Sequence, residues 1–148
     1  MANKFDFRRI EIRLKEAERG LSLSLANIAK NSFLDNFKDQ GFNGKKWQEV
    51  QRRTAGTKAF AGNKDRGKRT RAILQGKGSG RLRRDVANSV NNGVKNSELS
   101  YTLVVANPYA SYHNDGTAKI PQRQFVGMTP KLNRQILSKI NEKLSKIW

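Results

Sequence analysis

The segment Lys45–Arg84 carries most of the charge of this chain and little of its apolar content. It holds 14 Lys and Arg residues and only two acids, so its net charge is 14 − 2 = +12, out of +18 for all 148 residues. Within 52–68 the apolar anchors are few, and Phe60 is the main interruption. We therefore predict a long, exposed, basic loop that is mobile in the free protein.

The basic excess predicts attraction to a polyanion, either nucleic acid or an acidic protein surface. The candidate contact residues lie in the second half of the basic segment: Arg66, Lys68, Arg69, Arg71, Arg81, Arg83 and Arg84. Facing DNA, these side chains would attract phosphates without reading bases. Facing a protein, they would meet acidic surfaces. The sequence leaves both partners open.

Apolar residues at steps of three and four predict helices within residues 1–40. Two stripes carry this pattern, first Ile10, Leu14, Ala17 and Leu21, then Leu25, Ile28, Ala29, Phe33 and Phe37. Gly20 between the stripes predicts a bend, and Gly41 is the predicted C-terminal cap of the second helix.

A further helix is predicted at 128–148, where Thr129 is suited to the N-cap and Pro130 to the first helical position. Its apolar stripe is Leu132, Ile136, Ile140, Leu144 and Ile147, with Leu137 beside it. The basic side chains of this segment fall on or near the opposite, wet face.

The middle of the chain predicts turns and strands. Asn43-Gly44 favours a tight turn, after which Trp47 is expected to dock as a core anchor. We predict a flexible glycine-rich turn at 75–80, a partly regular strand over 86–94, and a clear strand over 99–106.

Motifs that carry enzyme chemistry are scarce. The order Gly-Lys-Gly-Ser-Gly over 76–80 does not match the nucleotide-binding loop template. There is one histidine and no cysteine, so we predict no metal site, no cofactor and no disulfide. Ser111, His113 and Asp115 are close in sequence, which does not establish the geometry of a catalytic triad. We also predict no secretory signal and no membrane span.

The stretch 107–116 and the run 120–127 are the most distinctive parts of the chain. They read Asn-Pro-Tyr-Ala-Ser-Tyr-His-Asn-Asp-Gly and Ile-Pro-Gln-Arg-Gln-Phe-Val-Gly. This pair resembles the signature of the phage virion morphogenesis (tail completion) family, of the Mu-like phage type. In that family a Tyr-Ala-x-x-His-x-x-Gly run precedes Ile-Pro-x-Arg-x-Phe-x-Gly and a C-terminal helix.

Further blocks extend the resemblance over most of the chain. The run 43–47 is similar to the family's Asp-Gly-x-x-Trp, and 73–74 with 80–83 is similar to its Ile-Leu and Gly-x-Leu block. Asn43, Asp85 and Gln124 depart from the family pattern, and the loop 54–70 has no counterpart. The matching positions are Trp47, Gly80, Leu82, Tyr109, Ala110, His113, Gly116, Pro121, Arg123, Phe125 and Gly127.

The resemblance implies an α+β fold, in which the N-terminal helices and a C-terminal helix pack on a small antiparallel β-sheet. It implies one domain over 1–148: helices in 1–40, a basic loop region in 41–84, strands and the signature loop in 85–127, and the last helix in 128–148.

The resemblance also implies a structural virion protein and not an enzyme. Such a protein assembles as a homo-oligomeric ring, a hexamer being one candidate form, at the neck or tail end of the particle after synthesis in the host cytoplasm. Its partners would be phage connector and tail-tube proteins, with non-specific DNA contact in the ring lumen and no membrane. A stand-alone basic nucleic-acid-binding protein is the alternative.

The signature residues have expected roles. Phe125 is expected to fill the core, Gly116 to take a positive φ, and at least one of Tyr109 and Tyr112 to be buried. Arg123 is a candidate for pairing with an acid of a neighbouring subunit. The other interpretation is that all of these residues define the fold and contact no partner.

Overall fold

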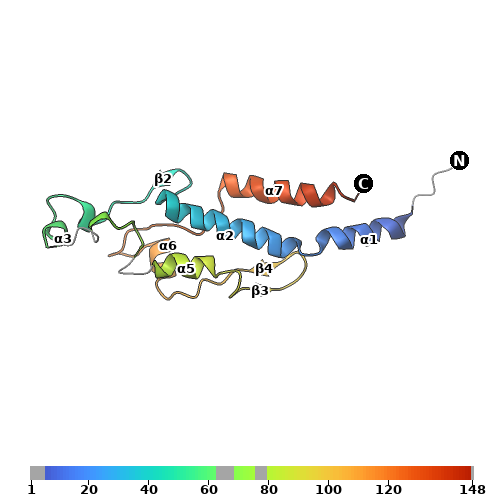
Figure 1. The fold of residues 1–148 in the computed structure, drawn as a ribbon, viewed down its shortest axis with the longest axis horizontal. Coiled ribbons are helices and arrows are strands. Elements are labelled where there is room, and N and C mark those ends of the chain that lie inside the picture. The colour runs from blue at the N-terminus through green and yellow to red at the C-terminus, as the bar shows by residue number, and fades with distance from the viewer. Residues whose placement is uncertain (1–5, 63–68, 76–79, 148) are drawn as a thin grey trace.

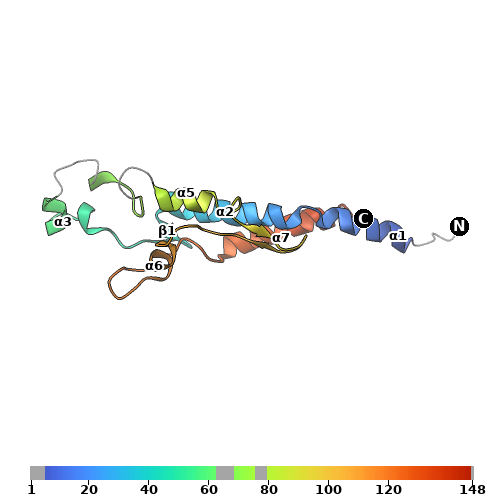
Figure 2. The same cartoon turned by 90° about the horizontal axis from the view of Figure 1, so that it is seen from below.

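The protein is elongated, and one long helix runs through its centre (Figures 1 and 2). This computed structural model describes residues 6–62, 69–75 and 80–147. The helices are α1 (Phe7–Glu18), α2 (Leu21–Asp39), the 3-10 helix η1 (Gln51–Arg53), α3 (Lys58–Ala61), α5 (Arg81–Ala87), α6 (Ala110–Asp115) and α7 (Pro130–Leu144). The strands are β1 (Gly41–Phe42), β2 (Lys45–Lys46), β3 (Val94–Lys95) and β4 (Tyr101–Thr102).

The two N-terminal helices are confirmed, with the break at Gly20. The Asp6 carboxylate caps α1 by accepting from the backbone N–H groups of Arg8 and Arg9 at 3.1 and 3.3 Å. Gly20 then takes a left-handed conformation with φ of +69°, which starts α2 in a new direction.

The end of α2 differs from the prediction, because Gln40 and not Gly41 takes the left-handed C-cap conformation. Gly41 instead begins β1, where a Cβ atom would lie 2.5 Å from the Lys45 carbonyl oxygen. The predicted Asn43-Gly44 turn is confirmed. Both residues have positive φ, and they join β1 to β2 in antiparallel register, with Gly41 opposite Lys46.

The second hairpin, β3–β4, secures the start of α2. Val94 pairs with Thr102 and Lys95 with Tyr101. Glu98, in the loop of this hairpin, accepts from Gly20 N through its carboxylate and from Ser22 N through its carbonyl, both at 3.1 Å. These bonds satisfy backbone donors that the first turn of a helix leaves unpaired.

The predicted strand over 86–94 is wrong, because residues 86–87 end the helix α5 and most of the residues that follow form turns. Gly80, with a left-handed φ of +51°, is the residue before α5. The glycine-rich turn therefore leads into a helix, whereas the sequence predicted a strand there. Val86 and Val90 are both buried. Val86 lies on α5, which packs on α2, and Val90 lies in the turn that follows α5.

The predicted strand over 99–106 is correct only at Tyr101–Thr102. The residues that follow alternate between half-buried and exposed, as in a strand, and Leu103 and Val105 pack on the core. Val104 N donates to the Ser89 carbonyl at 3.0 Å. This segment therefore lies extended along the helices rather than within a sheet.

The C-terminal helix α7 begins as predicted. The Thr129 hydroxyl accepts from Leu132 N at 3.1 Å, and Pro130 occupies the first turn. Leu132 is 1% exposed and Ile147 is also buried. α7 lies alongside α2, and its end meets α1 (Figure 1).

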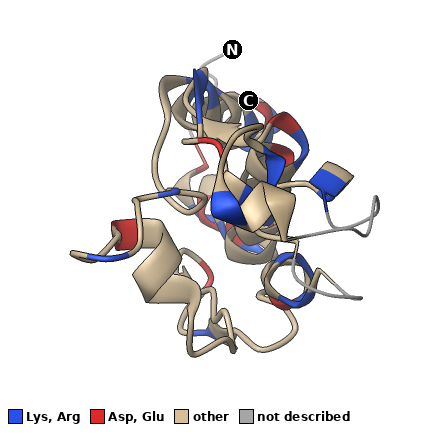
Figure 3. Ribbon diagram, turned by 90° about the vertical axis from the view of Figure 1, so that its left-hand side faces the viewer, with Lys and Arg blue, Asp and Glu red and all other residues tan. Residues whose placement is uncertain are grey.

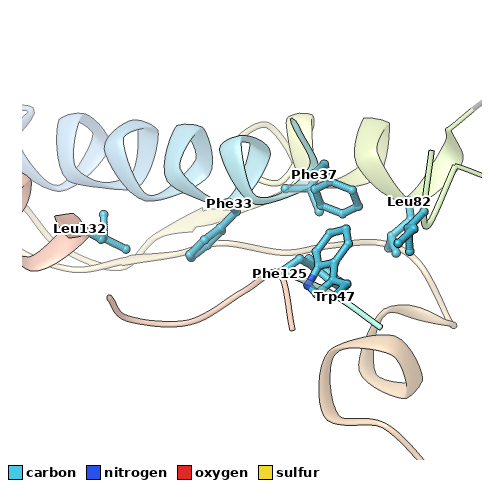
Figure 4. Packing of buried hydrophobic residues seen from close by; sticks show 8 residues of the cluster. Phe33, Phe37, Trp47, Leu82, Phe125 and Leu132 are labelled. Carbon is cyan, nitrogen blue, oxygen red and sulfur yellow. The ribbon is translucent and has the colours of Figure 1, made fainter. Parts of the chain in front are cut away.

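The core lies between α2, α5, α7 and the extended segments that cross them (Figure 4). Its buried members are Phe33, Phe37, Trp47, Ile73, Leu82, Val86, Phe125 and Leu132. The α+β class is confirmed, although the described strands form two separate two-stranded ladders and not one sheet. Among the described residues, no helix has the length and apolar character that crossing a bilayer requires.

Phe125 is 1% exposed, so Phe125→Ala is expected to lower the free energy of unfolding by about 3–5 kcal/mol. Urea unfolding followed by Trp fluorescence measures this change. Tyr109→Ala is the control, because Tyr109 is 61% exposed and its loss is expected to cost within about 0.5 kcal/mol. Equal costs for the two variants would contradict the placement of Phe125 in the core.

Candidate functional site

Three of the residues that carry the family resemblance, Trp47, Leu82 and Phe125, lie near the C-terminal end of α2 (Figure 4). Trp47 packs edge-on against Phe37, with ring centroids 5.7 Å apart and planes at 83°. Phe125 packs against the same Phe37 ring at 5.1 Å. Leu82, from α5, is buried in the same cluster. Two landmarks distant in sequence, Trp47 and Phe125, therefore share one aromatic residue of α2, and a third, Leu82, belongs to the same cluster.

Trp47 is both a core residue and a hydrogen-bond donor. Its indole Nε1–H donates to the Gln124 carbonyl at 2.8 Å. The prediction that Trp47 anchors the core is confirmed, since it is buried. The bond also sets the position of 124–127 relative to the β1–β2 hairpin. Gly127 supports this close approach, because a Cβ there would lie 2.9 Å from the Phe42 ring.

The signature stretch 107–116 forms the short helix α6 and not a strand or an open turn. Ser111, His113 and Asp115 occupy alternate positions of this helix, so their side chains do not share a face. This arrangement does not match a catalytic triad. Within the described residues, no cluster of three His, Cys, Asp or Glu is arranged to hold a metal ion.

Asn114 joins α6 to the segment that contains Phe125. Its side-chain oxygen accepts from the backbone N–H groups of Phe125 and Val126 at 3.1 and 2.9 Å. On the opposite side, the Asn36 side chain donates to the Phe125 carbonyl at 2.9 Å. The backbone of Phe125 is therefore held by two amide side chains that the sequence analysis did not single out. Asn114 lies inside the quoted signature, but in sequence it resembles any solvated Asn.

Gly116 has the predicted positive φ, +77°, at the end of α6. A Cβ atom there would lie 2.9 Å from Gln122 N. The chain folds back at this point, because Thr117 N donates to the Ile120 carbonyl and Arg123 N donates to the His113 carbonyl, both at 2.8 Å. Pro121, within this loop, is half-buried.

Arg123 is buried inside the chain, which does not fit its predicted pairing with an acid of a neighbouring subunit. Its Nε and one terminal nitrogen both donate to the Gln48 carbonyl at 3.2 Å. Burial, chiefly, and the nearby charge of Arg52 lower the pKa of Arg123 from its usual value, while Glu49 acts in the opposite direction. Arg123 thus fixes residue 48 beside Trp47.

His113 lies near Arg123. Its Nδ1 atom is buried and has no hydrogen-bond partner within the described residues. Burial lowers the pKa of His113 below its usual value, and the charge of Arg123 lowers it further. The imidazole is therefore expected to be neutral at pH 7.

The tyrosines of the signature are a correction to the sequence analysis, because neither is buried. Tyr109 is 61% exposed and Tyr112 is 52% exposed. Ala110, between them, is half-buried and packs against the core cluster. The small residue, and not an aromatic one, faces inward because α6 packs closely on the core.

The predicted basic contact residues are divided by the structure. Arg81, Arg83 and Arg84 are exposed on α5. Arg69 is half-buried, with its guanidinium carbon 4.2 Å from the centre of the Phe60 ring and a hydrogen bond to the Phe60 carbonyl at 3.0 Å. Arg71 is half-buried. Arg66 and Lys68 lie outside the described residues.

The predicted exposed loop contains ordered elements at its base. Arg52 donates to the carbonyl groups of Arg71 and Ala72 at 3.1 and 3.0 Å. The Gln40 side-chain oxygen accepts from Ile73 N and from Arg53, both at 3.0 Å. Figure 3 views the molecule from this end and shows Lys and Arg on several neighbouring segments.

Comparison with protein-family models, with curated proteins and with solved structures finds no match to this chain. The family resemblance therefore depends on the residues quoted above and stays a prediction.

Gly116→Ala is expected to destabilise the fold more than Gly44→Ala, although both residues have positive φ. A Cβ at Gly44 has no heavy atom within 4 Å, so the cost there is only the left-handed backbone penalty of about 1–2 kcal/mol. Gly116 has φ of +77° and ψ of 168°, a conformation that is essentially restricted to glycine, and the overlap with Gln122 adds to the cost of leaving it, for a total of about 3 kcal/mol or more. Chemical denaturation of both variants tests the difference, and equal losses would contradict the close approach at Gly116.

The lowered pKa of His113 predicts a loss of stability on mild acidification. Below about pH 6.5 the unfolded chain binds a proton at His113 that the folded chain resists, so the free energy of unfolding falls until the pH reaches the folded-state pKa. His113 is the only histidine, so NMR titration of one imidazole measures this pKa directly. His113→Gln is expected to flatten the change in urea midpoint between pH 7 and 5.5. An imidazole that titrates at or above 6.5 would contradict its burial.

Proposed function

We propose that this chain is a virion structural protein that completes the phage tail or joins it to the head. It acts by assembling with copies of itself and with neighbouring virion proteins, and it catalyses no reaction. Its place is at the neck or tail end of the particle. The specific virion role rests on the family resemblance, and the self-assembly rests on the surface of the molecule.

The observation that carries the assembly proposal is the amount of apolar side chain left on the surface. Among the described residues, twelve large hydrophobic side chains are exposed, as many as the hydrophobic side chains that are buried. A surface of this kind is typical of a subunit that buries part of it against other chains.

The landmark residues support a scaffold role in this proposal. Trp47, Arg123 and Phe125 each hold one segment against another within the chain. Their work is to fix the end of α2 and the loops around it, so that the outer surfaces have a defined shape. This favours the interpretation in which the landmarks define the fold, and it leaves partner contacts to exposed residues.

The basic end supplies the second part of the proposed function. Arg81, Arg83 and Arg84 are exposed on α5, near the ordered base of the basic segment. Charged groups in this position attract phosphates if the end faces the lumen of a ring, or acidic protein surfaces if it faces outward. Both versions remain part of the proposal.

The same three arginines favour the alternative, a stand-alone nucleic-acid-binding protein. Gel-shift assays over a range of salt concentrations separate the two functions. The alternative requires tight binding at physiological salt, whereas the proposed function requires only weak binding that fades as salt rises.

Deleting this reading frame from the genome that carries it is expected to leave tails and DNA-filled heads unjoined in electron micrographs, with infectivity lost. Wild-type protein supplied from a plasmid restores joined particles. Normal particles and normal infectivity without this protein would overturn the proposed function.

Complementation with the triple variant Arg81→Ser, Arg83→Ser and Arg84→Ser tests the basic end. It is expected to restore fewer infectious particles than the control triple Lys38→Ser, Lys119→Ser and Lys131→Ser, which removes the same charge at exposed positions elsewhere. Equal rescue by both variants would show that total charge, and not its place on α5, matters.

A further inference from the structure

Helix α1 is amphipathic, yet none of its residues is buried. Phe7, Ile10, Leu14 and Ala17 recur at steps of three and four and form one apolar stripe. Phe7 is 76% exposed and Leu14 is 40% exposed. The helix has 12 residues, about 18 Å of length, which is short for a helix to persist in water without packing. The stripe therefore needs a surface to pack against.

Within the described residues, α1 meets the rest of the chain at the end of α7 and at the start of α2. Arg13 donates to the Ile147 carbonyl at 3.0 Å. A hollow between α1 and the end of α7 is lined by Arg13, Glu16, Ala17, Lys143 and Lys146. The N-terminal half of α1 extends past the end of α7 in both side views (Figures 1 and 2).

A second exposed apolar strip lies on α7. Leu137 is 51% exposed and Leu144 is 42% exposed. They are seven residues apart, two helical turns, so they share one face, and half-buried Ile140 lies between them near the same face. The buried Leu132 marks the separate face of α7 that packs on the core. This strip and the α1 stripe are both narrow, as in a two-helix seam.

Charge favours a second copy of this chain as the occupant. The whole chain carries +18, so two copies repel each other over most of their surfaces. α1 is close to neutral, with four basic residues and three acids, Glu11, Glu16 and Glu18. α7 has four basic residues and one acid, Glu142. Within the chain, Glu16 already lies in the hollow with Lys143 and Lys146, so acids of α1 and lysines of α7 are suited to meet.

We propose that the apolar stripe of α1, centred on Ile10 and Leu14, packs on the Leu137–Leu144 strip of α7 in a second copy. This inference rests on the proposed function and names the interface through which that function assembles. The two surfaces differ, so the contact is heterologous, and each copy offers one of each surface. Repetition of such a contact gives a closed ring when the rotations between successive copies add up to a full turn. The basic end, at the far side of the molecule from α1, stays clear of this contact.

The absence of cysteine makes disulfide trapping a direct test. Leu14→Cys and Leu137→Cys are made in separate chains that carry tags of different mass, then mixed under mild oxidation. The expected product is a mixed disulfide at least about five-fold above that from Leu14→Cys with Leu99→Cys, a control at a residue that is 62% exposed. Equal yields in the two mixtures, or a Leu14–Leu14 product that exceeds the mixed one, would overturn the interface.

Charge placed in either surface tests the energetics. Leu14→Glu and Leu137→Glu are each expected to raise the dissociation constant for self-association at least about tenfold, measured by light scattering after size exclusion. Both sites are exposed, so thermal unfolding of the monomer is expected to be unchanged. If Leu14→Glu also lowers the unfolding temperature of the monomer, the test is the effect of Leu137→Glu on the dissociation constant for self-association.

The outcomes separate this interface from the proposed function. Wild-type oligomers that both Glu variants leave intact would overturn the interface and leave the virion role standing. A wild-type chain that stays monomeric at every concentration would overturn the interface as well. The virion role is tested independently, by examining the particles that form when the reading frame is deleted.

Discussion

The contact of Phe37 with Trp47 and Phe125 is the interaction on which the rest of the structure depends. Phe37 ends a long helix, Trp47 follows a tight hairpin, and Phe125 lies in an extended segment that precedes α7. Edge-on and tilted aromatic pairs of this kind add to the energy of burial and restrict the relative orientation of the segments. Three hydrogen bonds satisfy polar groups that this packing buries. Trp47 donates to the Gln124 carbonyl, Asn36 donates to the Phe125 carbonyl, and Asn114 accepts from Phe125 N.

The sequence predicted correctly those features that depend on a few neighbouring residues. The Thr129-Pro130 start of α7, the bend at Gly20 and the Asn43-Gly44 turn depend on a few neighbouring residues, and all are confirmed. The strand predicted through Val86 and Val90 was wrong: valine favours strands, whereas in the structure Val86 is buried on α5, which packs on α2, and Val90 is buried in the turn that follows. The exposure of Tyr109 and Tyr112 and the inward guanidinium of Arg123 depend on packing between distant segments, which a single sequence does not encode locally. Asn36, Asn114 and Gln40 were missed for the same reason.

The two ends of the molecule differ in charge. The basic segment lies around α3 and α5, and the near-neutral α1 lies at the opposite end (Figure 1). Two basic molecules approach most easily through the ends where their charge is least. In the proposed assembly, contacts between copies through α1 would therefore form apart from contacts of the basic end with an anionic partner.

The closed base of the basic segment has a consequence for its length. Arg52 bonds to the carbonyls at 71 and 72, Gln40 accepts from Ile73, and Arg123 holds residue 48. The two ends of the loop between residues 53 and 71 are thus held next to the core by hydrogen bonds. Lengthening a loop whose ends are already joined costs little conformational entropy. A change in the length of the loop between these two fastened ends is therefore expected to leave the fold beneath it intact.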